Sequence, residues 1–283
     1  MKLLTTEQFK EHFKIEENCL ILSPHVAMIA DLCGYTNFSY GSANHLPGLD
    51  VKYDSVLIDI QEDVPFPRSK ANHEFAWLKH SFLYLKDNGI LYAKIPSYLC
   101  IRLSEMTYLN PEQIVIENDS AFVRVVKNKN YSLTEVKYSD KIVKMNIRKD
   151  TLMQEYNENH LKFLKGKKEI DSSRFIQFHH LNNGDKNTVT EMYDKYLKGQ
   201  DSSKVLFITD GGHWRDPYLL EENPDGKSGC RAVVMDSHED VLKVKNHLCS
   251  KEVKDFIQNI TFGKTYSLKA SIKRILCNPD NIK

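Results

Sequence analysis

The chain has 283 residues, 41% of them hydrophobic, which is enough for one large domain or two smaller ones. Its net charge of +1 excludes nucleic-acid binding through overall charge, so any such contact needs local basic clusters. No apolar run reaches the roughly 18 residues of a membrane helix, and the charged start MKLLTTEQFKEHFK is not typical of a secretory signal. We therefore expect a cytoplasmic protein without a membrane partner.

The first elements alternate between helix and strand. A helix is predicted at 5–13, with Phe9 and Phe13 on one face. A short buried strand follows at 19–22 (CLIL), and then a second helix at 25–33 that ends at Gly34. The stretch YTNFSYG, residues 35–41, is a weak strand candidate.

A strand–helix–strand unit is predicted next. Residues 55–60 (SVLIDI) form a nearly continuous apolar strand, which is typical of a parallel sheet covered on both faces. A helix at 73–86 carries one apolar stripe, formed by Phe75, Leu78, Phe82 and Leu85. The turn at 87–89 (DNG) leads into the strand ILYAKIP. This spacing predicts a right-handed parallel crossover.

A hairpin and a polar segment follow. Residues 114–117 and 121–127 read as two strands joined by a short Asn-Asp-Ser turn. The sequence then becomes rich in Lys, Asp, Glu and Asn, with a polar helix predicted at 158–168. We divide the chain into a first α/β domain at 1–135, a polar connecting segment at 136–170 and a second domain at 171–283.

The second domain is predicted to be α+β. Its strands are expected at 174–178, 205–209 and 231–235, with a helix at 187–197 and two more helices near the end of the chain. A glycine-rich excursion separates the last two strands.

Two stretches resemble class I DNA adenine-N6 methyltransferases that use S-adenosyl-L-methionine. The first is YDSVLIDI…LKHSFLYLKDNGILYAKIPSYL, similar to the family's catalytic strand, the following helix and the next strand. The second, AVVMDSHEDVLKVKNHLCSKEVKDFIQNITFGKTYSLKASIKRILCNP, is similar to the target-recognition region. The resemblance implies a truncated Rossmann-like methyltransferase sheet, mostly parallel with an antiparallel edge hairpin, followed by an α+β recognition domain.

The cofactor motifs of that family are altered in this chain. The family has glycines directly after the first strand, where the backbone approaches the cofactor; here Pro24, His25 and Val26 stand there. The family also ends its second strand with an acidic residue for the ribose hydroxyls, whereas YTNFSYGS has no carboxylate. We expect no cofactor if the site is degenerate, and S-adenosyl-L-methionine if it is active.

The loop that holds the target base is altered too. The family's Asp/Asn/Ser-Pro-Pro-Tyr/Phe loop binds the target amine and stacks on the flipped base. In this chain only Asp59 matches it directly, while a shifted alignment over 63–66 restores one proline and Phe66. Asp59 and Phe66 are the candidate catalytic residues, and the alternative is that the acids here are solvated loop charges.

Two other segments have residue types suited to DNA. Two glycines before Trp214 permit close backbone approach, an indole stacks on bases, and basic side chains bind phosphate. The alternative is that the tryptophan packs on the sheet and the lysines are ordinary solvated charges. The candidate DNA-binding residues are His213, Trp214, Arg215, Tyr266, Lys269 and Lys273.

Other chemistry finds less support in the sequence. No HExxH motif, paired-cysteine spacing or phosphate loop GxxxxGK[ST] is present, so we expect no metal site. The six cysteines are scattered singly, which predicts reduced, buried thiols.

The leading hypothesis is a DNA-binding, catalytically degenerate relative of DNA adenine methyltransferases. It would act on double-stranded DNA as a specificity or accessory subunit of a modification or restriction system, with a catalytic partner subunit. One alternative is an active adenine-N6 methyltransferase that uses S-adenosyl-L-methionine. A second alternative is a non-catalytic protein-interaction scaffold.

Overall fold

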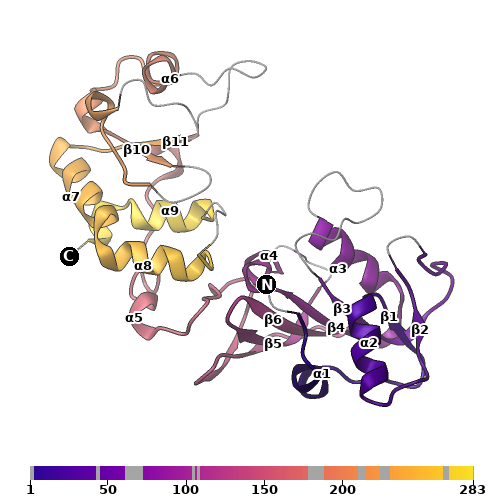
Figure 1. Ribbon diagram of the computed structural model, residues 1–283. Coiled ribbons are helices and arrows are strands. Elements are labelled where there is room, and N and C mark those ends of the chain that lie inside the picture. Colours follow the sequence, from indigo (N-terminus) through magenta and orange to yellow (C-terminus); the bar gives the residue numbers. More distant parts are fainter. Residues whose placement is uncertain are drawn as a thin grey trace. The chain divides into compact units, whose positions relative to one another are not determined.

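The chain forms two compact units, unit 1 (Met1–Tyr156) and unit 2 (Asn157–Lys283), which are described separately. Both combine helices with a β-sheet, so the predicted α/β class is confirmed (Figure 1). The structure is a computed structural model that describes residues 3–42, 45–60, 73–103, 106, 109–177, 188–209, 215–223, 230–263 and 268–282.

Unit 1 is built on an eight-stranded sheet. Its N-terminal helix begins with a capping box. Thr5 Oγ1 accepts a hydrogen bond from the backbone N–H of Gln8, and Gln8 Oε1 accepts one from the backbone N–H of Thr5. The elements of unit 1 are α1 (Thr6–His12), β1 (Cys19–Ile21), α2 (Pro24–Leu32), β2 (Ser39–Tyr40), β3 (Tyr53–Asp59), α3 (His73–Leu83), β4 (Leu85–Pro96), α4 (Cys100–Leu103), β5 (Pro111–Glu117), β6 (Ser120–Val126), β7 (Thr134–Lys137) and β8 (Ile142–Met145).

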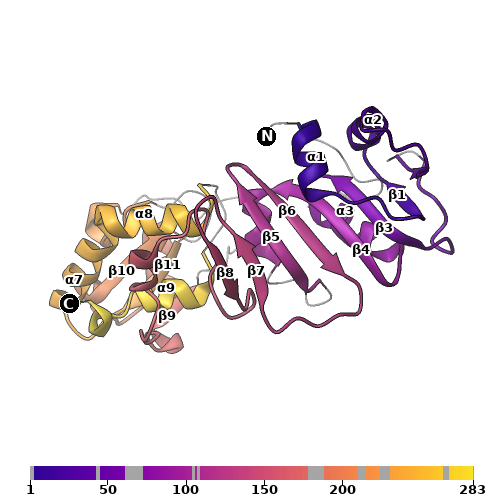
Figure 2. The same ribbon diagram turned by 90° about the horizontal axis from the view of Figure 1, so that it is seen from below.

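The sheet of unit 1 has the strand order β2-β1-β3-β4-β6-β5-β7-β8 (Figure 2). The strands β2, β1, β3 and β4 run parallel to one another. The predicted hairpin β5–β6 joins β4 antiparallel through β6, and β7 and β8 extend the sheet beyond β5. The expected mostly parallel sheet with an antiparallel hairpin is confirmed, but the hairpin does not form the edge of the sheet, because β7 and β8 lie beyond β5.

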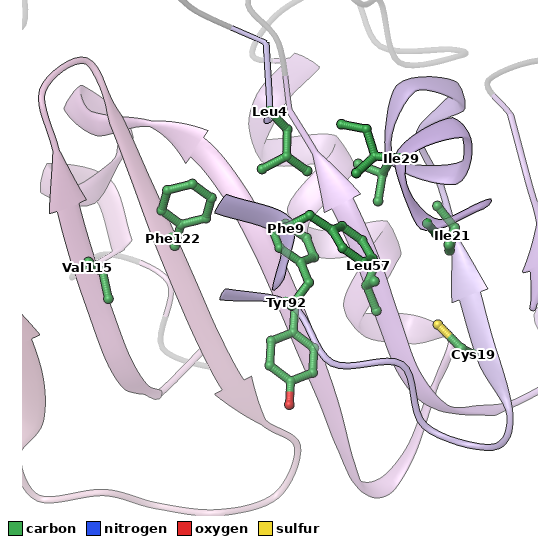
Figure 3. Packing of buried hydrophobic residues seen from close by; sticks show 12 residues of the cluster. Leu4, Phe9, Cys19, Ile21, Ile29, Leu57, Tyr92, Val115 and Phe122 are labelled. Atoms are coloured by element: carbon green, nitrogen blue, oxygen red, sulfur yellow. The ribbon is translucent and has the colours of Figure 1, made fainter. Parts of the chain in front are cut away.

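Helices α1 and α2 pack on the same face of this sheet through a shared apolar core (Figure 3). Phe9 of α1 and Phe13, the residue that caps the end of this helix, stack with ring centroids 5.5 Å apart, and Phe13 meets the ring of Phe122 edge-on. Leu57 and Tyr92, which are opposite one another on β3 and β4, lie under α1. The predicted spacing of the two phenylalanines on one helical face accounts for this contact.

Helix α3 connects β3 to β4 and ends earlier than predicted. The sequence pattern extended it to Lys86, but the helix ends at Leu83. Leu85, which we assigned to the apolar stripe of the helix, already belongs to β4 and pairs with Tyr53. The chain bends within β4 at Asn88, whose φ is 63°, a value that asparagine tolerates better than most residues.

The segment 136–170, predicted as a polar connection, contains regular structure. Strand β7 ends at Lys137 and β8 follows it as the outermost strand, so the sheet continues into this segment. The division between the compact units lies after Tyr156. The polar helix predicted at 158–168 is only the short α5 (Glu158–Leu161).

Unit 2 contains a three-stranded antiparallel sheet of order β10-β11-β9. Its core includes Val205 and Phe207 of β10, Ala232 of β11 and Met192 of α6. The elements of unit 2 after α5 are β9 (Phe175–Gln177), α6 (Val189–Tyr196), β10 (Val205–Thr209), β11 (Cys230–Val234), α7 (His238–Cys249), α8 (Lys251–Ile260) and α9 (Ala270–Leu276).

Two features bear on the expectations about cysteines and membranes. The cysteines whose environment is described are free, and burial raises the pKa of the Cys19 thiol to about 11 and that of Cys277 to about 12. Thiols with such raised pKa values stay protonated and unreactive at neutral pH. Among the described residues, no helix is long and apolar enough to cross a membrane.

Candidate functional site

The strand order of unit 1 reverses at β1. The next strand in the chain, β2, pairs with β1 on one side, and β3 then pairs with β1 on the other side. Because the three strands are parallel, their carboxyl ends lie at one edge of the sheet. Open α/β sheets bind ligands outside this edge, where the strand order reverses. This edge is the candidate functional site.

A cavity of about 250 Å³, named here the switch-point cavity, lies at this edge. Ser23 and Pro24 line it from the junction of β1 and α2, and Asp59 lines it from the end of β3. Trp77 of α3, with 3% of its surface exposed, supplies an aromatic wall. Apolar walls with a few polar groups are typical of sites for small molecules.

Asp59 forms a buried ion pair with Lys94. The two residues are directly opposite in the register of β3 and β4, and Lys94 Nζ lies 3.3 Å from Asp59 Oδ2. The side chain of Asp59 is 0% exposed and that of Lys94 is 1% exposed. The second carboxylate oxygen, Oδ1, is buried and has no hydrogen-bond partner within the described part of the chain. The ammonium group therefore occupies one oxygen of the candidate catalytic acid.

Burial raises the pKa of the Asp59 carboxyl above its ordinary value. The positive charge of Lys94 and its hydrogen bond oppose this rise in pKa, as does the nearby His25. Desolvation is the largest of these effects, so the site holds the carboxylate at a cost that Lys94 only partly offsets.

His25 connects the cavity to the N-terminal segment. It lies in the first turn of α2, and its Nε2 donates to the carbonyl oxygen of Leu4 at 2.9 Å in the tautomer that protonates this nitrogen. Leu3, the neighbour of Leu4, lines the cavity. The residues before α1 therefore cover one side of the switch-point cavity.

The residues at this edge do not fit S-adenosyl-L-methionine in the manner that the resemblance implies. Helix α2 begins at Pro24, directly after Ser23, which leaves no glycine turn between β1 and the helix. Strand β2 is followed by Gly41 and Ser42 and offers no carboxylate for ribose hydroxyls. The two alterations noted in the sequence are thus both at the carboxyl edge of the sheet.

The predicted site residues lie in different parts of the chain. Phe66, His213, Trp214 and Tyr266 lie outside the described residues. Asp59 belongs to unit 1, whereas Arg215, Lys269 and Lys273 belong to unit 2.

Of the candidate DNA contacts that are described, Arg215 is exposed and Lys269 is half-buried at the start of α9. Lys273 is different, with only 2% of its surface exposed. It lies next to Ile272 on the buried side of α9, so its spacing from Lys269 does not place both on an outer face. Burial therefore makes Lys273 unsuitable as a DNA contact.

Ser23, His25 and Trp77, which line the switch-point cavity, were not predicted as site residues, and neither was Lys94, the ion-pair partner of Asp59. Lys94 had the clearest signal in the sequence, because it is a lone charge in the apolar strand ILYAKIP. A charge buried in such a strand needs a partner, and the acid at the end of the preceding parallel strand is the nearest candidate.

No protein-family model and no curated protein sequence matches the chain. Among solved structures, a protein assigned to the class I S-adenosylmethionine-dependent methyltransferases, from Listeria monocytogenes, matches with a TM-score of 0.34 and 10% identity, over 48% of this chain and 63% of that chain. The type I restriction-modification methyltransferase subunit from Streptococcus thermophilus matches with a TM-score of 0.28 and 17% identity, over 42% of this chain and 35% of that chain. The M protein of the type I restriction enzyme EcoKI matches with a TM-score of 0.31 and 9% identity, over 92% of this chain and 56% of that chain.

In each of these three matches, the alignment covers less than two thirds of the other chain's length. The matched structures are methyltransferases or methyltransferase subunits by their descriptions. Identities and scores of this size establish no common activity, substrate or partner.

Proposed function

We propose that this chain is a DNA-binding, catalytically degenerate relative of DNA adenine methyltransferases that serves as a specificity or accessory subunit. The observation that carries the proposal is the buried ion pair between Asp59 and Lys94. An adenine methyltransferase needs an accessible side-chain oxygen to accept the target amine. Here the acid at the end of β3 has 0% of its side chain exposed and shares one oxygen with an ammonium group.

The junction of β1 and α2 supports the same conclusion about the cofactor. A ligand held at a strand-to-helix turn needs backbone that it can approach closely, which glycine provides. In this chain the turn is replaced by a proline that opens the helix. We infer that S-adenosyl-L-methionine does not bind here and that a catalytic partner subunit supplies any methyl transfer.

The DNA-binding part of the proposal rests on unit 2. Lys and Arg outnumber Asp and Glu in unit 2, whereas the reverse holds in unit 1. Arg215 is exposed, and Lys269 is the N-cap residue of α9, two residues after the segment 264–267 that contains Lys264 and Tyr266. Basic side chains in such positions bind phosphate and raise the salt dependence of binding.

An active methyltransferase is the second candidate, and one observation favours it. The switch-point cavity lies where a ligand is expected, and Asp59 Oδ1 has no hydrogen-bond partner among the described residues. Entry of a ligand with an amino or hydroxyl group would satisfy this oxygen.

Calorimetric titration with S-adenosyl-L-methionine separates the two candidates. We expect no binding in the micromolar range, because the glycine turn and the ribose carboxylate are missing. Micromolar binding by the wild type that a cavity-filling Ser23→Phe variant abolishes would show that the cofactor occupies the switch-point cavity. The degenerate assignment would then be wrong.

A gel-shift titration with duplex DNA at two salt concentrations tests the proposed surface. We expect Arg215→Ala and Lys269→Ala each to weaken binding and to reduce the slope of log K against log salt by about 1. Lys86→Ala, at an exposed ion pair in unit 1, is the matched control and should leave the slope unchanged. If neither unit 2 variant alters affinity or slope, this DNA surface is refuted and the interaction scaffold is favoured.

A further inference from the structure

We propose that Glu11, His12 and Glu117 form a binding site for a divalent transition-metal ion, with Zn²⁺ the best fit. The three residues, named here the α1–β5 cluster, come from the last turn of α1 and the end of β5. Their nitrogen and oxygen ligand atoms all lie within 4.8 Å of one another. The cluster does not belong to the switch-point cavity, and the proposal is independent of the function proposed above.

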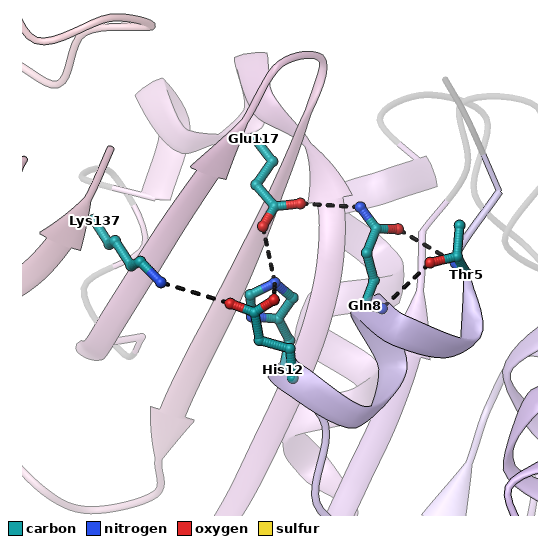
Figure 4. A network of polar contacts seen from close by, with 6 residues as sticks. Thr5, Gln8, His12, Glu117 and Lys137 are labelled. Carbon is teal, nitrogen blue, oxygen red and sulfur yellow. Dashed lines mark hydrogen bonds and ion pairs between the residues drawn. The ribbon is translucent and has the colours of Figure 1, made fainter. Parts of the chain in front are cut away.

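The distances in the α1–β5 cluster suit a single ion (Figure 4). His12 Nε2 lies 3.0 Å from Glu117 Oε1 and 3.9 Å from Glu11 Oε2. Tetrahedral zinc with bonds of about 2.1 Å separates its ligand atoms by about 3.4 Å. Each of the two distances from His12 therefore differs from the spacing that the metal requires by about half an ångström, and the two carboxylate oxygens lie within 4.8 Å of each other.

Each carboxylate of the cluster has one oxygen near His12, and its second oxygen lies near a donor from a neighbouring residue. Gln8 Nε2 donates to Glu117 Oε2 at 2.9 Å, and Lys137 Nζ lies 3.6 Å from Glu11 Oε1. Gln8 is fixed in turn by the capping box with Thr5 (Figure 4). One oxygen of each acid consequently faces His12, while the second interacts with Gln8 or Lys137. Metal sites commonly orient their carboxylate ligands through outer hydrogen bonds of this kind.

The imidazole of His12 is fixed in position. Its ring stacks on Phe122 with centroids 3.9 Å apart and an interplanar angle of 25°, and its side chain is 6% exposed. A ring held on an aromatic surface presents Nε2 to the two acids with little loss of side-chain freedom on metal binding.

The charge and ligand types select the class of ion. Two carboxylates and the Lys137 ammonium leave one net negative charge when His12 is neutral, so a divalent cation is favoured. One imidazole and two carboxylates suit zinc, and three protein ligands leave a fourth position for water or a small ligand. Glu11 and His12 also line a cavity of about 330 Å³, which gives that position access to solvent.

Sequence spacing could not reveal this site, and we expected none. Glu11 and His12 are adjacent, but Glu117 lies 105 residues further along the chain than His12. Only the packing of α1 on the sheet brings them together.

Zinc binding to the full chain tests the proposal. After treatment with a chelator and dialysis, we expect the wild type to bind one Zn²⁺ per chain by calorimetry and elemental analysis. Saturation with Zn²⁺ at about a hundredfold excess over Kd should raise Tm by about 5 °C or more. Co²⁺ in place of Zn²⁺ should give the visible absorption of a tetrahedral ion.

The variants distinguish the cluster from other metal-binding groups of the chain. Glu11→Gln should weaken Zn²⁺ binding about tenfold or more, and His12→Gln should abolish it. Glu17→Gln, which removes an exposed acid outside the cluster, should bind as the wild type does. If the wild type retains no zinc, or if Glu11→Gln and His12→Gln bind it as tightly as Glu17→Gln, the cluster is only a hydrogen-bonded tether. Because Glu11 is more than half exposed, its variant keeps the test valid if His12→Gln fails to fold.

Discussion

Replacing Lys94 by methionine should lower the free energy of unfolding by about 3–5 kcal/mol, because it leaves the Asp59 carboxylate buried without its cation. Equilibrium denaturation monitored by circular dichroism measures this loss. The double variant Asp59→Asn with Lys94→Met should recover much of it, since neither buried charge then remains.

The exposed ion pair between Lys86 and Asp54 is the internal control, since it also joins β4 to β3. Its Nζ to Oδ1 distance is 2.9 Å, with side chains 44% and 41% exposed, so Lys86→Met should cost less than about 1 kcal/mol. A Lys94→Met effect of that same size would contradict the buried pair.

The pH dependence of the Lys94→Met variant follows from the raised pKa of Asp59. A carboxyl whose pKa is higher in the folded state favours folding below its unfolded pKa, and this contribution is lost as pH rises through the folded pKa. Removing Lys94 takes away the cation that lowers this pKa, so the pKa rises further. The difference in stability between the wild type and the variant should therefore shrink as pH falls from neutral into the acidic range.

Truncating Phe207 to alanine should destabilise unit 2 by about 3–5 kcal/mol, because the ring is fully buried and leaves a cavity. The ring stacks with Tyr218 at a centroid distance of 5.7 Å and belongs to the core of unit 2. Hydrogen exchange by mass spectrometry locates the effect: peptides from β10 and β11 should lose protection, while peptides from β3 and β4 keep theirs.

Leu242→Ala serves as the control for this variant, since the side chain lies on α7 in the same unit and is 40% exposed. It should change stability by no more than about 0.5 kcal/mol. An equal loss of protection in β3 and β4 after Phe207→Ala would show that the two units do not have separate cores.

Patterns of apolar residues predicted most of the elements that carry the fold. The spacing of Phe9 and Phe13, the apolar run before Asp59 and the hairpin of β5 and β6 each specified an element from local sequence. Such elements bury one stripe or both faces, and burial leaves a periodic signal. The turn residue Gly34, with φ of 85°, was likewise read from its type.

Elements that bury few side chains were not predicted from the sequence. Strand β8 alternates between exposed and half-buried residues and includes Ile142, which is 59% exposed, so no apolar period marks it. The end of α3 was misplaced because Leu85 continues a helical stripe in sequence while its backbone pairs with Tyr53. Pairing with a distant strand overrode the local pattern there.

For the candidate site, sequence reasoning found the acid but not its environment. Asp59 was identified through the resemblance of this stretch to the base-binding loop of DNA adenine methyltransferases. That it faces Lys94 depends on the register of β3 against β4, which no local pattern fixes. Lys273 shows the opposite limit, since its spacing from Lys269 suggested a shared outer face although the packing of α9 buries it.

The central place of β4 in the sheet has a consequence for synthesis of the chain. During translation β3 and β4 emerge before β6. The 12-residue β4 can therefore pair with β3 on one side before β6 is available to pair with it on the other. A fragment that stops before Ser120 would keep that apolar edge open, and open edges of this kind recruit other chains into aggregates. Attempts to produce unit 1 alone should therefore include all strands of the sheet and extend to Tyr156, since Leu152 and Met153 are buried.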